Sequence, residues 1–206
     1  LRNGLDVIMG DESLSHAANF LHMIQGEYPS EEASRLMDLD FILHAEHGSN
    51  ASSFTARVVT GTDADLHAAI TAAIGALSGP AHGGAAENVM TMAREIGDPE
   101  RANEYVKTKR GKREAIMGFG HRVYRAEDPR ARHLRSGVER LSVEKGEPHW
   151  NQILNALVDA MRPYSRHGVN VNVDFYSGVI YHLHGIPQDL FVPIFAVGRV
   201  PGWTLQ

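Results

Sequence analysis

The sequence predicts an all-α fold, and three observations support this prediction. Apolar residues recur at three- and four-residue spacing through most of the 206 residues. The alternation of apolar and polar residues that marks a strand is nearly absent, and its best case, Val169, Val171 and Val173, is too short to build a sheet. Glycine and proline stand where the helical patterns end. We therefore expect a bundle of packed helices.

The first two predicted helices have capping residues at their N-termini. Ser13 is a plausible N-cap for a helix over 14–24, which Gly26 would end. Ser30 would cap the next helix, over 31–41, and the two glutamates of its first turn suit the positive end of the helix dipole.

Proline and glycine delimit the later helices. Gly79-Pro80 stops one of them, Asp128-Pro129 reads as an N-cap with proline at the first helical position of another, and Pro163 closes a third. The apolar spacing places these later helices over 66–77, 89–96, 131–141, 150–161, 179–183 and 191–197.

The composition excludes several classes of protein. A net charge of -5 argues against a generally basic nucleic-acid binder, and the absence of cysteine excludes disulfides and thiolate chemistry. No apolar run approaches the roughly 20 residues that cross a membrane. The N-terminus also lacks the basic and then apolar order of a signal peptide. We therefore expect a cytoplasmic protein without nucleic-acid or membrane partners.

The segment Gly79-Pro-Ala-His82-Gly83-Gly84 places a histidine at a helix junction with little steric cover. The N-terminus of a following helix would lower the pKa of His82 and favour a neutral imidazole that can donate a hydrogen bond. The alternative for this segment alone is a turn histidine that faces water.

A second glycine-rich segment is Gly118-Phe119-Gly120-His121-Arg122. It is not a dinucleotide fingerprint, because it lacks a preceding strand and a third glycine. A basic run at 107–113 precedes it, so backbone donors beside an anion-attracting patch would suit a phosphorylated cofactor. A solvated cluster of charges at a helix end is the alternative.

Asp174 stands among apolar and aromatic neighbours, where partial desolvation would raise its pKa and its strength as a base. A helix N-cap is the alternative role for this aspartate. Arg130 and Arg199 are candidates for holding carboxylates, because a guanidinium binds a planar carboxylate through two hydrogen bonds.

His44 and His47 share a helix face at a spacing that could hold a metal. However, Glu46 lies on another face and the order HExxH is absent, so we expect no metal site. His182 and His184 would diverge on a helix, and a satisfied structural role is expected for both.

Five segments together resemble citrate synthases in identity, order and spacing. They read LHAEHGSNAS, AAIGALSGPAHGG, IMGFGHRVYRAEDPRA, NVNVDFYSGVIYHLHGIP and FAVGRVPGW. The resemblance implies a two-domain helical citrate-synthase-like fold, in which a smaller mobile domain closes over the substrates. The large domain would comprise 1–83 and the return segment 178–206, with the small domain over 84–177. Family members are longer at both ends, so the chain is expected to be truncated.

The resemblance also implies roles for individual residues. The catalytic trio would be His82, His121 and Asp174, and Ser52 would orient the first of these histidines. The residues expected to bind oxaloacetate or citrate are His47, His82, His121, Arg130 and Arg199. Those expected to cradle coenzyme A are Met117, Gly118, Phe119, Gly120 and Arg122.

The activity implied is that of citrate synthase, an acyltransferase of the tricarboxylic acid cycle. It condenses acetyl-CoA with oxaloacetate and hydrolyses the thioester, with the CoA thioester as co-substrate and no tightly bound cofactor. The alternatives are a 2-methylcitrate synthase that uses propionyl-CoA, and a truncated fragment that binds CoA or a dicarboxylate without turnover. The family also implies a homodimer. One departure is Ala86 in His82-Gly-Gly-Ala-Ala86-Glu87, where the family usually has asparagine.

Overall fold

The structure is a computed structural model that describes residues 6–79 and 82–205. Over these residues it contains α-helices and two short 3₁₀ helices and no named strand, so the predicted all-α class is confirmed. The only sheet-like pairing found there is an isolated antiparallel bridge between Phe119 and Val171. None of the described helices is both long and apolar enough to cross a membrane.

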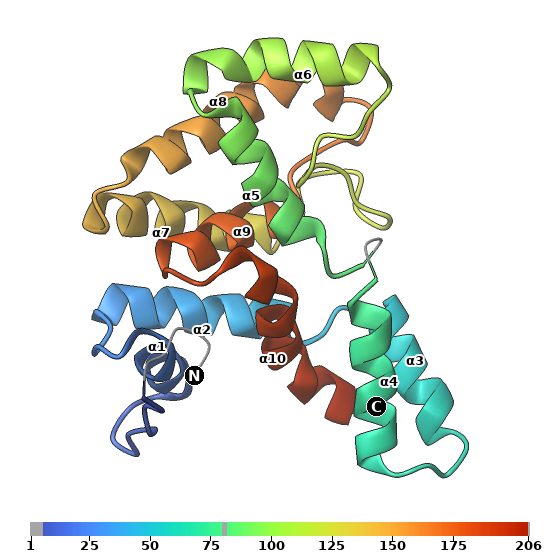
Figure 1. The fold of residues 1–206 in the computed structure, drawn as a ribbon. Coiled ribbons are helices and arrows are strands. Elements are labelled where there is room, and N and C mark those ends of the chain that lie inside the picture. Colours follow the sequence, from blue (N-terminus) through green and yellow to red (C-terminus); the bar gives the residue numbers. More distant parts are fainter. Residues whose placement is uncertain (1–5, 80–81, 206) are drawn as a thin grey trace.

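Most helices follow one another with brief connections, and the longest connection is the irregular segment 112–130 between α6 and α7 (Figure 1). Their bounds are α1 (His16–Gln25), α2 (Glu31–Ala45), α3 (Ala51–Thr60), α4 (Leu66–Leu77), α5 (Ala85–Ile96), η1 (Pro99–Arg101), α6 (Ala102–Gly111), α7 (Ala131–Glu144), α8 (Pro148–Ser165), α9 (Asp174–Leu183), η2 (Gln188–Leu190) and α10 (Phe191–Thr204).

Side-chain caps start the first helices, although one predicted cap is wrong. Ser13 is held in the preceding turn, where its N–H and its hydroxyl both donate to Asp11, at 2.8 and 2.6 Å. The cap of α1 is therefore Ser15, two residues later. Ser30 caps α2 as predicted, and Gly26 ends α1 in the left-handed conformation, also as predicted.

The helix α3 was not predicted, because its apolar residues point away from the core. Asn50 caps it, and its buried face carries the small polar residues Ser52 and Ser53. Phe54 and Val58 are instead 58% and 51% exposed. A reading based on apolar periodicity cannot find a helix whose buried face is made of serine and alanine.

Two helices extend past prolines. The sequence predicted the end of α8 at Pro163 and the end of α10 at Val197, and both predictions are wrong, because α8 runs through Pro163 and α10 through Pro201. A proline removes one N–H donor from the helix ladder. Burial of Met161 near the end of α8 and of Trp203 near the end of α10 keeps each segment helical.

The start of α7 also differs from its prediction. Asp128 is not the N-cap, because the helix begins at Ala131 after a turn. The buried carboxylate of Asp128 accepts hydrogen bonds from the backbone N–H and the guanidinium of Arg130 instead. Asp128 therefore holds both the backbone turn before α7 and the side chain of Arg130, a residue of the candidate site.

The buried apolar side chains form two clusters. The larger joins α1, α2 and the helices α5 to α9 with the start of α10. The smaller joins α3, α4 and α10, and contains Ala56, Leu77, Phe195 and Trp203. Figure 1 shows α3 and α4 side by side at one end of the molecule, away from α6 and α8. This packing does not test the predicted division of the chain into domains over 1–83, 84–177 and 178–206, which stays a prediction.

Glycines let the helices that carry the site residues cross closely. A Cβ at Gly178 of α9 would lie 2.4 Å from the carbonyl oxygen of Ala86 on α5. A Cβ at Gly202 of α10 would lie 1.8 Å from the carbonyl oxygen of Ala45 on α2. Larger residues would force these helices apart, so the glycines fix where Asp174 and Arg199 sit.

Candidate active site

His82 is held through one ring nitrogen by Ser52. The Nε2 atom lies 2.9 Å from the Ser52 hydroxyl and 3.3 Å from the Ser52 backbone nitrogen. The hydroxyl also lies 2.8 Å from Asn50 Oδ1 and accepts from the indole N–H of Trp203 at 3.2 Å. The predicted pairing of Ser52 with His82 is thus present, and it joins the N-terminal end of α3 to the connection between α4 and α5.

These contacts bear on the protonation of His82. A backbone N–H can only donate, so the Ser52 amide favours an Nε2 without hydrogen and a proton on Nδ1. Burial lowers the pKa of His82, and the positive charge of Arg199 lowers it further. The predicted neutral imidazole is supported, although burial rather than a helix dipole is the main cause.

His121 is fixed by its own loop. Its Nδ1 accepts hydrogen bonds from the backbone N–H groups of Val123 at 3.0 Å and Tyr124 at 3.1 Å. Two donors on one ring nitrogen require the neutral tautomer with its hydrogen on Nε2. Burial lowers the pKa of His121, as does the charge of Arg130, against the opposing effects of Asp128 and Asp174. The ring therefore offers one N–H donor.

His47 packs against His121 and Tyr124. The two imidazole rings meet edge to face with centroids 5.1 Å apart, and His47 Nε2 lies 3.1 Å from the Tyr124 hydroxyl. Burial lowers the pKa of His47, and Arg130 adds to this effect. The cluster joins the end of α2 to the loop before α7.

Asp174 is the first residue of α9, and Val173 holds the N-cap position. Its Oδ1 is buried without a hydrogen-bond partner among the described residues. Burial raises the pKa of Asp174, whereas the charges of His44 and Arg130 oppose the rise. Asp174 is therefore not the N-cap of α9, and its raised pKa is of the kind that is common at functional sites.

Arg130 forms a bidentate ion pair with Asp128, whose carboxylate is fully buried. The bonds from Nε and Nη2 are 3.1 and 2.7 Å long. Asp128 orients the guanidinium, and the Arg130 side chain stays 13% exposed. Because Arg130 interacts electrostatically with His47, His121 and Asp174, it lies among the predicted site residues.

Arg199 is 2% exposed and holds the backbone of α2. Its Nε donates to the carbonyl oxygen of His44, and its guanidinium lies 4.9 Å from the ring centroid of Phe195. Burial lowers the pKa of Arg199 to about 10. Its Nη1 is buried without a hydrogen-bond partner among the described residues, so the donors of this atom are unused there.

The glycine turn before His121 is anchored to the segment before α9. The N–H of Gly120 donates to the Asn170 carbonyl at 2.7 Å, and the Asn172 side chain donates to the Gly120 carbonyl at 3.0 Å. Gly118 and Gly120 both have positive φ, 76° and 91°. Met117 and Arg122, predicted with them to contact CoA, are exposed.

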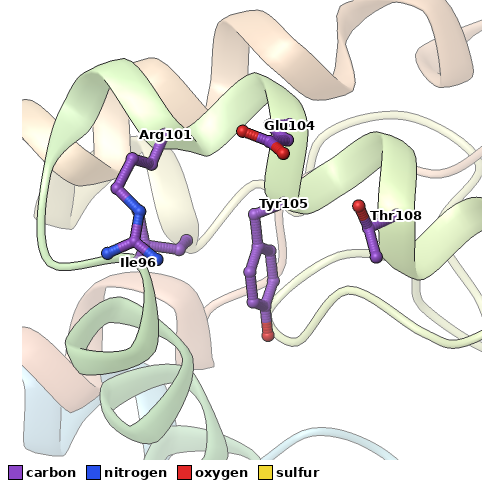
Figure 2. A pocket seen from close by; sticks show the side chains of 5 residues that line it. All are labelled: Ile96, Arg101, Glu104, Tyr105 and Thr108. Carbon is purple, nitrogen blue, oxygen red and sulfur yellow. The ribbon is translucent and has the colours of Figure 1, made fainter.

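The predicted basic run and a surface pocket lie apart from this cluster. The basic run at 107–113 ends α6, where Lys109 pairs with Glu114 and Arg110 stacks on Tyr164. A surface pocket of about 210 Å³ lies between α5 and α6 and includes none of the predicted site residues (Figure 2). Its lining residues are Ile96, Arg101, Glu104, Tyr105 and Thr108.

The structure shows no metal cluster among its described residues, and His182 and His184 differ in their hydrogen-bond partners. The described residues contain no group of three or more His, Cys, Asp or Glu that could hold a metal ion. His182 interacts with Arg94 and Glu147, as a satisfied structural histidine would. His184 is 2% exposed with both ring nitrogens unpartnered among the described residues, so that prediction fails for it.

Sequence reasoning missed three supporting residues. Tyr124 supports both His47 and His121, Trp203 donates to Ser52, and the Phe195 ring contacts His44, His82 and Arg199. All three belong to segments that resemble the citrate synthase family, and this resemblance is the signal that could have identified them. Their partners lie far away in sequence, so no local pattern pairs them.

The chain is similar to known proteins over its whole length. Residues 1–206 match the family model described as citrate synthase, C-terminal domain. Citrate synthase 2 of Bacillus subtilis is 48% identical, with 98% of this chain and 54% of that protein covered. A 2-methylcitrate synthase of Mycobacterium tuberculosis is 44% identical, with 98% and 51% covered. The chain thus spans about half the length of the curated relatives it matches.

Solved structures agree with these relatives. The citrate synthase of Pyrobaculum aerophilum superposes with a TM-score of 0.92 at 42% identity, covering 98% of this chain and 51% of that one.

A solved ternary complex of carboxymethyl coenzyme A and oxaloacetate with the citrate synthase of Thermoplasma acidophilum superposes with a TM-score of 0.87 at 35% identity, covering 94% of this chain and 52% of that one. The family model, the relatives and these structures all agree with the helical fold and with the resemblance of the five sequence segments. The chain belongs to the citrate synthase family.

Proposed function

We propose that this chain carries the catalytic centre of a citrate synthase, which condenses acetyl-CoA with oxaloacetate and releases citrate and CoA. The observation that supports the proposal is a buried carboxyl and two imidazoles in one electrostatic cluster. Asp174 has a raised pKa and a buried oxygen without a partner among the described residues, while His82 and His121 are imidazoles with lowered pKa values.

In this proposal Asp174 removes a proton from the methyl group of the acetyl thioester. That proton is weakly acidic, so the step needs both a positioned carboxylate and stabilisation of the charge that develops on the thioester oxygen. Burial of Asp174 Oδ1 supports this role, because a desolvated carboxylate is a stronger base than one in water.

His82 would donate a hydrogen bond to the developing enol or enolate oxygen. The Ser52 amide at Nε2 leaves the ring proton on Nδ1, which is the nitrogen available to a substrate. A neutral donor can stabilise the oxygen without first giving up a proton.

His121 would polarise the ketone of oxaloacetate and protonate it as the carbon–carbon bond forms. Its two backbone donors at Nδ1 direct the single ring proton to Nε2. The cationic side chains Arg130 and Arg199 would hold the substrate carboxylates, which turns a bimolecular encounter into an oriented one. The spare donor of Arg199 supports this assignment.

The turn from Met117 to Gly120, together with Arg122, would cradle coenzyme A. Its support is the open backbone at Gly120, where a Cβ would meet nothing within 4 Å. The ternary complex of the Thermoplasma enzyme, which contains carboxymethyl coenzyme A and oxaloacetate, supports both substrates by similarity. Hydrolysis of the citryl thioester would then drive the reaction forward, and closure of a mobile small domain would exclude water until condensation is complete.

The nearest alternative is a 2-methylcitrate synthase, because a relative with that name is 44% identical. One methylene in an apolar pocket provides only about 1–3 kcal/mol of discrimination, so the two activities need similar sites. A homodimer and a cytoplasmic location complete the proposal, and they are supported by family membership and composition respectively.

The test is thiol release from acetyl-CoA and from propionyl-CoA in the presence of oxaloacetate. We expect faster release from acetyl-CoA, and a strong preference for propionyl-CoA would overturn the citrate assignment. Thermal unfolding with and without oxaloacetate should accompany the assay. Stabilisation by oxaloacetate without thiol release would favour a binding fragment that lacks turnover.

A further inference from the structure

Asp40 and His44 form a buried ionisable pair on α2. The pair interacts electrostatically with Asp174 and has no role in the reaction proposed for this chain. Asp40 is 0% exposed and His44 is 1% exposed. Asp40 accepts a hydrogen bond from the Ser177 hydroxyl at 2.6 Å and another from the Tyr181 hydroxyl at 2.7 Å, both on α9. The pair therefore ties α2 to the helix that begins with Asp174.

The contacts of His44 determine which ring nitrogen carries hydrogen. Its Nδ1 lies 2.8 Å from the carbonyl oxygen of Asp40 and 3.4 Å from the Asp40 carboxylate. Both partners can only accept, so Nδ1 is a donor. The other nitrogen, Nε2, is buried without a hydrogen-bond partner among the described residues.

Asp174 Oδ1 is buried and unpartnered in the same way. His44 and Asp174 interact electrostatically, and each stabilises the charged form of the other. A protonated Nε2 is a donor and a carboxylate oxygen is an acceptor, so the two unpartnered atoms are chemically complementary.

The charges around His44 favour the imidazolium. Burial opposes its charge, but the carboxylates of Asp40 and Asp174 raise the pKa of His44 above its ordinary value. Arg199 faces the backbone of His44, because its Nε donates to the His44 carbonyl. Tyr181 meets Asp40 as a neutral hydroxyl, since burial and Asp40 raise its pKa well above the ordinary value.

The charges around Asp174 are mixed. His44 and Arg130 favour its carboxylate form, whereas Asp40 and Asp128 oppose it, and burial opposes it most. The other titratable groups that interact with Asp174 are His121, Tyr181 and Arg199. Of the two cations that favour ionisation of Asp174, Arg130 is already engaged by Asp128, and His44 is the fully buried one.

We propose that His44, held by Asp40, is a positioning residue for Asp174 that supplies a buried positive charge and keeps the desolvated carboxylate ionised. The inference rests on the proposed function, because ionisation of Asp174 matters when Asp174 is the base. The backbone carbonyl of the same residue accepts a hydrogen bond from Arg199, so His44 also contacts a candidate substrate-binding arginine, through its main chain rather than its charge.

The test is a carboxyl carbon-13 NMR titration of Asp174 in the 206-residue chain, with the resonance assigned by Asp174→Asn. In His44→Asn the side-chain amide can still donate to the Asp40 carbonyl, but it carries no charge. We expect the Asp174 midpoint to rise by about one pH unit, a tenfold loss in its ionisation constant. An unchanged or lower midpoint overturns the proposal.

The matched control is His184→Asn. His184 is also a buried histidine, at 2% exposure, but it is not among the groups that interact with Asp174. We expect its substitution to leave the Asp174 midpoint in place, and an equal rise in both variants overturns the proposal, because it would indicate general loosening of the core.

A second measurement covers the case in which His44→Asn does not fold. A nitrogen-15 NMR titration of the wild-type chain should show a midpoint for His44 above the ordinary value of about 6.5. A midpoint below that value overturns the proposal. Neither titration requires turnover. Absence of thiol release would therefore refute the proposed function, whereas the two titrations would still decide the inference about His44.

Discussion

At the scale of single residues, burial and a few fixed donors determine the charge state of each side chain in the candidate site. His121 is neutral because two backbone N–H groups occupy one ring nitrogen. Asp174 has a raised pKa because its carboxyl is buried, and its Oδ1 is unpartnered among the described residues. Such a carboxylate favours function at the cost of fold stability.

This cost predicts a change in stability for Asp174→Asn. Because the folded-state pKa of Asp174 is raised above the ordinary 3.8, the folded chain binds more protons than the unfolded chain between those two values. Its stability therefore falls as pH rises through that window, and the loss persists at neutral pH. We expect the asparagine variant to melt at a higher temperature than wild type at neutral pH.

Melting curves recorded from acidic to neutral pH would check this prediction. The stability advantage of the variant should vanish in acid, where the wild-type carboxyl is also neutral. A variant less stable than wild type at neutral pH would show that the carboxylate stabilises the fold.

A second prediction concerns the hydroxyl that orients His82. In Ser52→Ala the ring loses its 2.9 Å contact and the buried indole N–H of Trp203 loses its acceptor. We expect kcat for thiol release to fall roughly tenfold to hundredfold through misplacement of the donor. The free energy of unfolding should fall by about 1–3 kcal/mol.

Ser53→Ala is the matched control, because Ser53 is equally buried and follows Ser52 in α3. Its hydroxyl accepts from Asn50 at 2.9 Å and donates to Glu46 at 3.3 Å, whereas the contacts of His82 Nε2 go to Ser52. We expect a loss of stability with kcat preserved. Equal losses of kcat in both variants would mean that the helix end, rather than the Ser52 hydroxyl, matters.

The sequence predicted the site residues through their motifs but not through their partners. His82, His121 and Asp174 stand on glycine-flanked or apolar segments, where their chemistry could be inferred locally. The contact of Trp203 with Ser52 joins residues 151 positions apart, and no local pattern encodes such a pair. The ion pair of Asp128 with Arg130 was mistaken for a helix cap, because an aspartate before a proline fits both roles.

At the scale of elements, the glycine turn before His121 determines where the imidazole lies. Gly118 and Gly120 both adopt positive φ, but their surroundings differ. A Cβ at Gly118 would lie 2.6 to 3.0 Å from atoms of Phe175, whereas a Cβ at Gly120 would meet nothing within 4 Å. The turn is therefore wedged against the start of α9.

Alanine substitutions at Gly118 and at Gly120 test this close packing of the turn against α9. Gly120→Ala should cost about 1–2 kcal/mol of unfolding free energy from its backbone conformation alone. Gly118→Ala should cost about 1–3 kcal/mol more, because Phe175 must also move. Chemical denaturation of both variants measures the difference, and equal losses would contradict the close contact with Phe175.

Element prediction succeeded where the buried face is apolar and failed elsewhere. The helices over 31–41 and 66–77 were found because leucine and alanine recur on their buried faces. The helix α3 was missed because its buried face is serine and alanine. The ends of α8 and α10 were misplaced because tertiary burial outweighs the proline signal near a helix end.

At the scale of the whole molecule, the catalytic candidates are supplied by segments far apart in the chain. Ser52 lies in the first turn of α3, His82 lies between α4 and α5, Asp174 starts α9, and Arg199 lies within α10. Figure 1 shows how these helices are arranged. The smaller apolar cluster carries the Ser52 end of the site, and the larger cluster carries the Asp174 end. A movement of one cluster relative to the other would thus change the distance between Asp174 and His82.

The most direct test of the central claim is thiol release by wild type and Asp174→Asn, measured together with oxaloacetate binding by thermal shift. We predict release from acetyl-CoA and oxaloacetate by the wild-type chain. The variant should lose this release by roughly a hundredfold or more while still binding oxaloacetate, because the asparagine cannot accept the methyl proton. Near-normal thiol release by Asp174→Asn would contradict the assignment of Asp174 as the base.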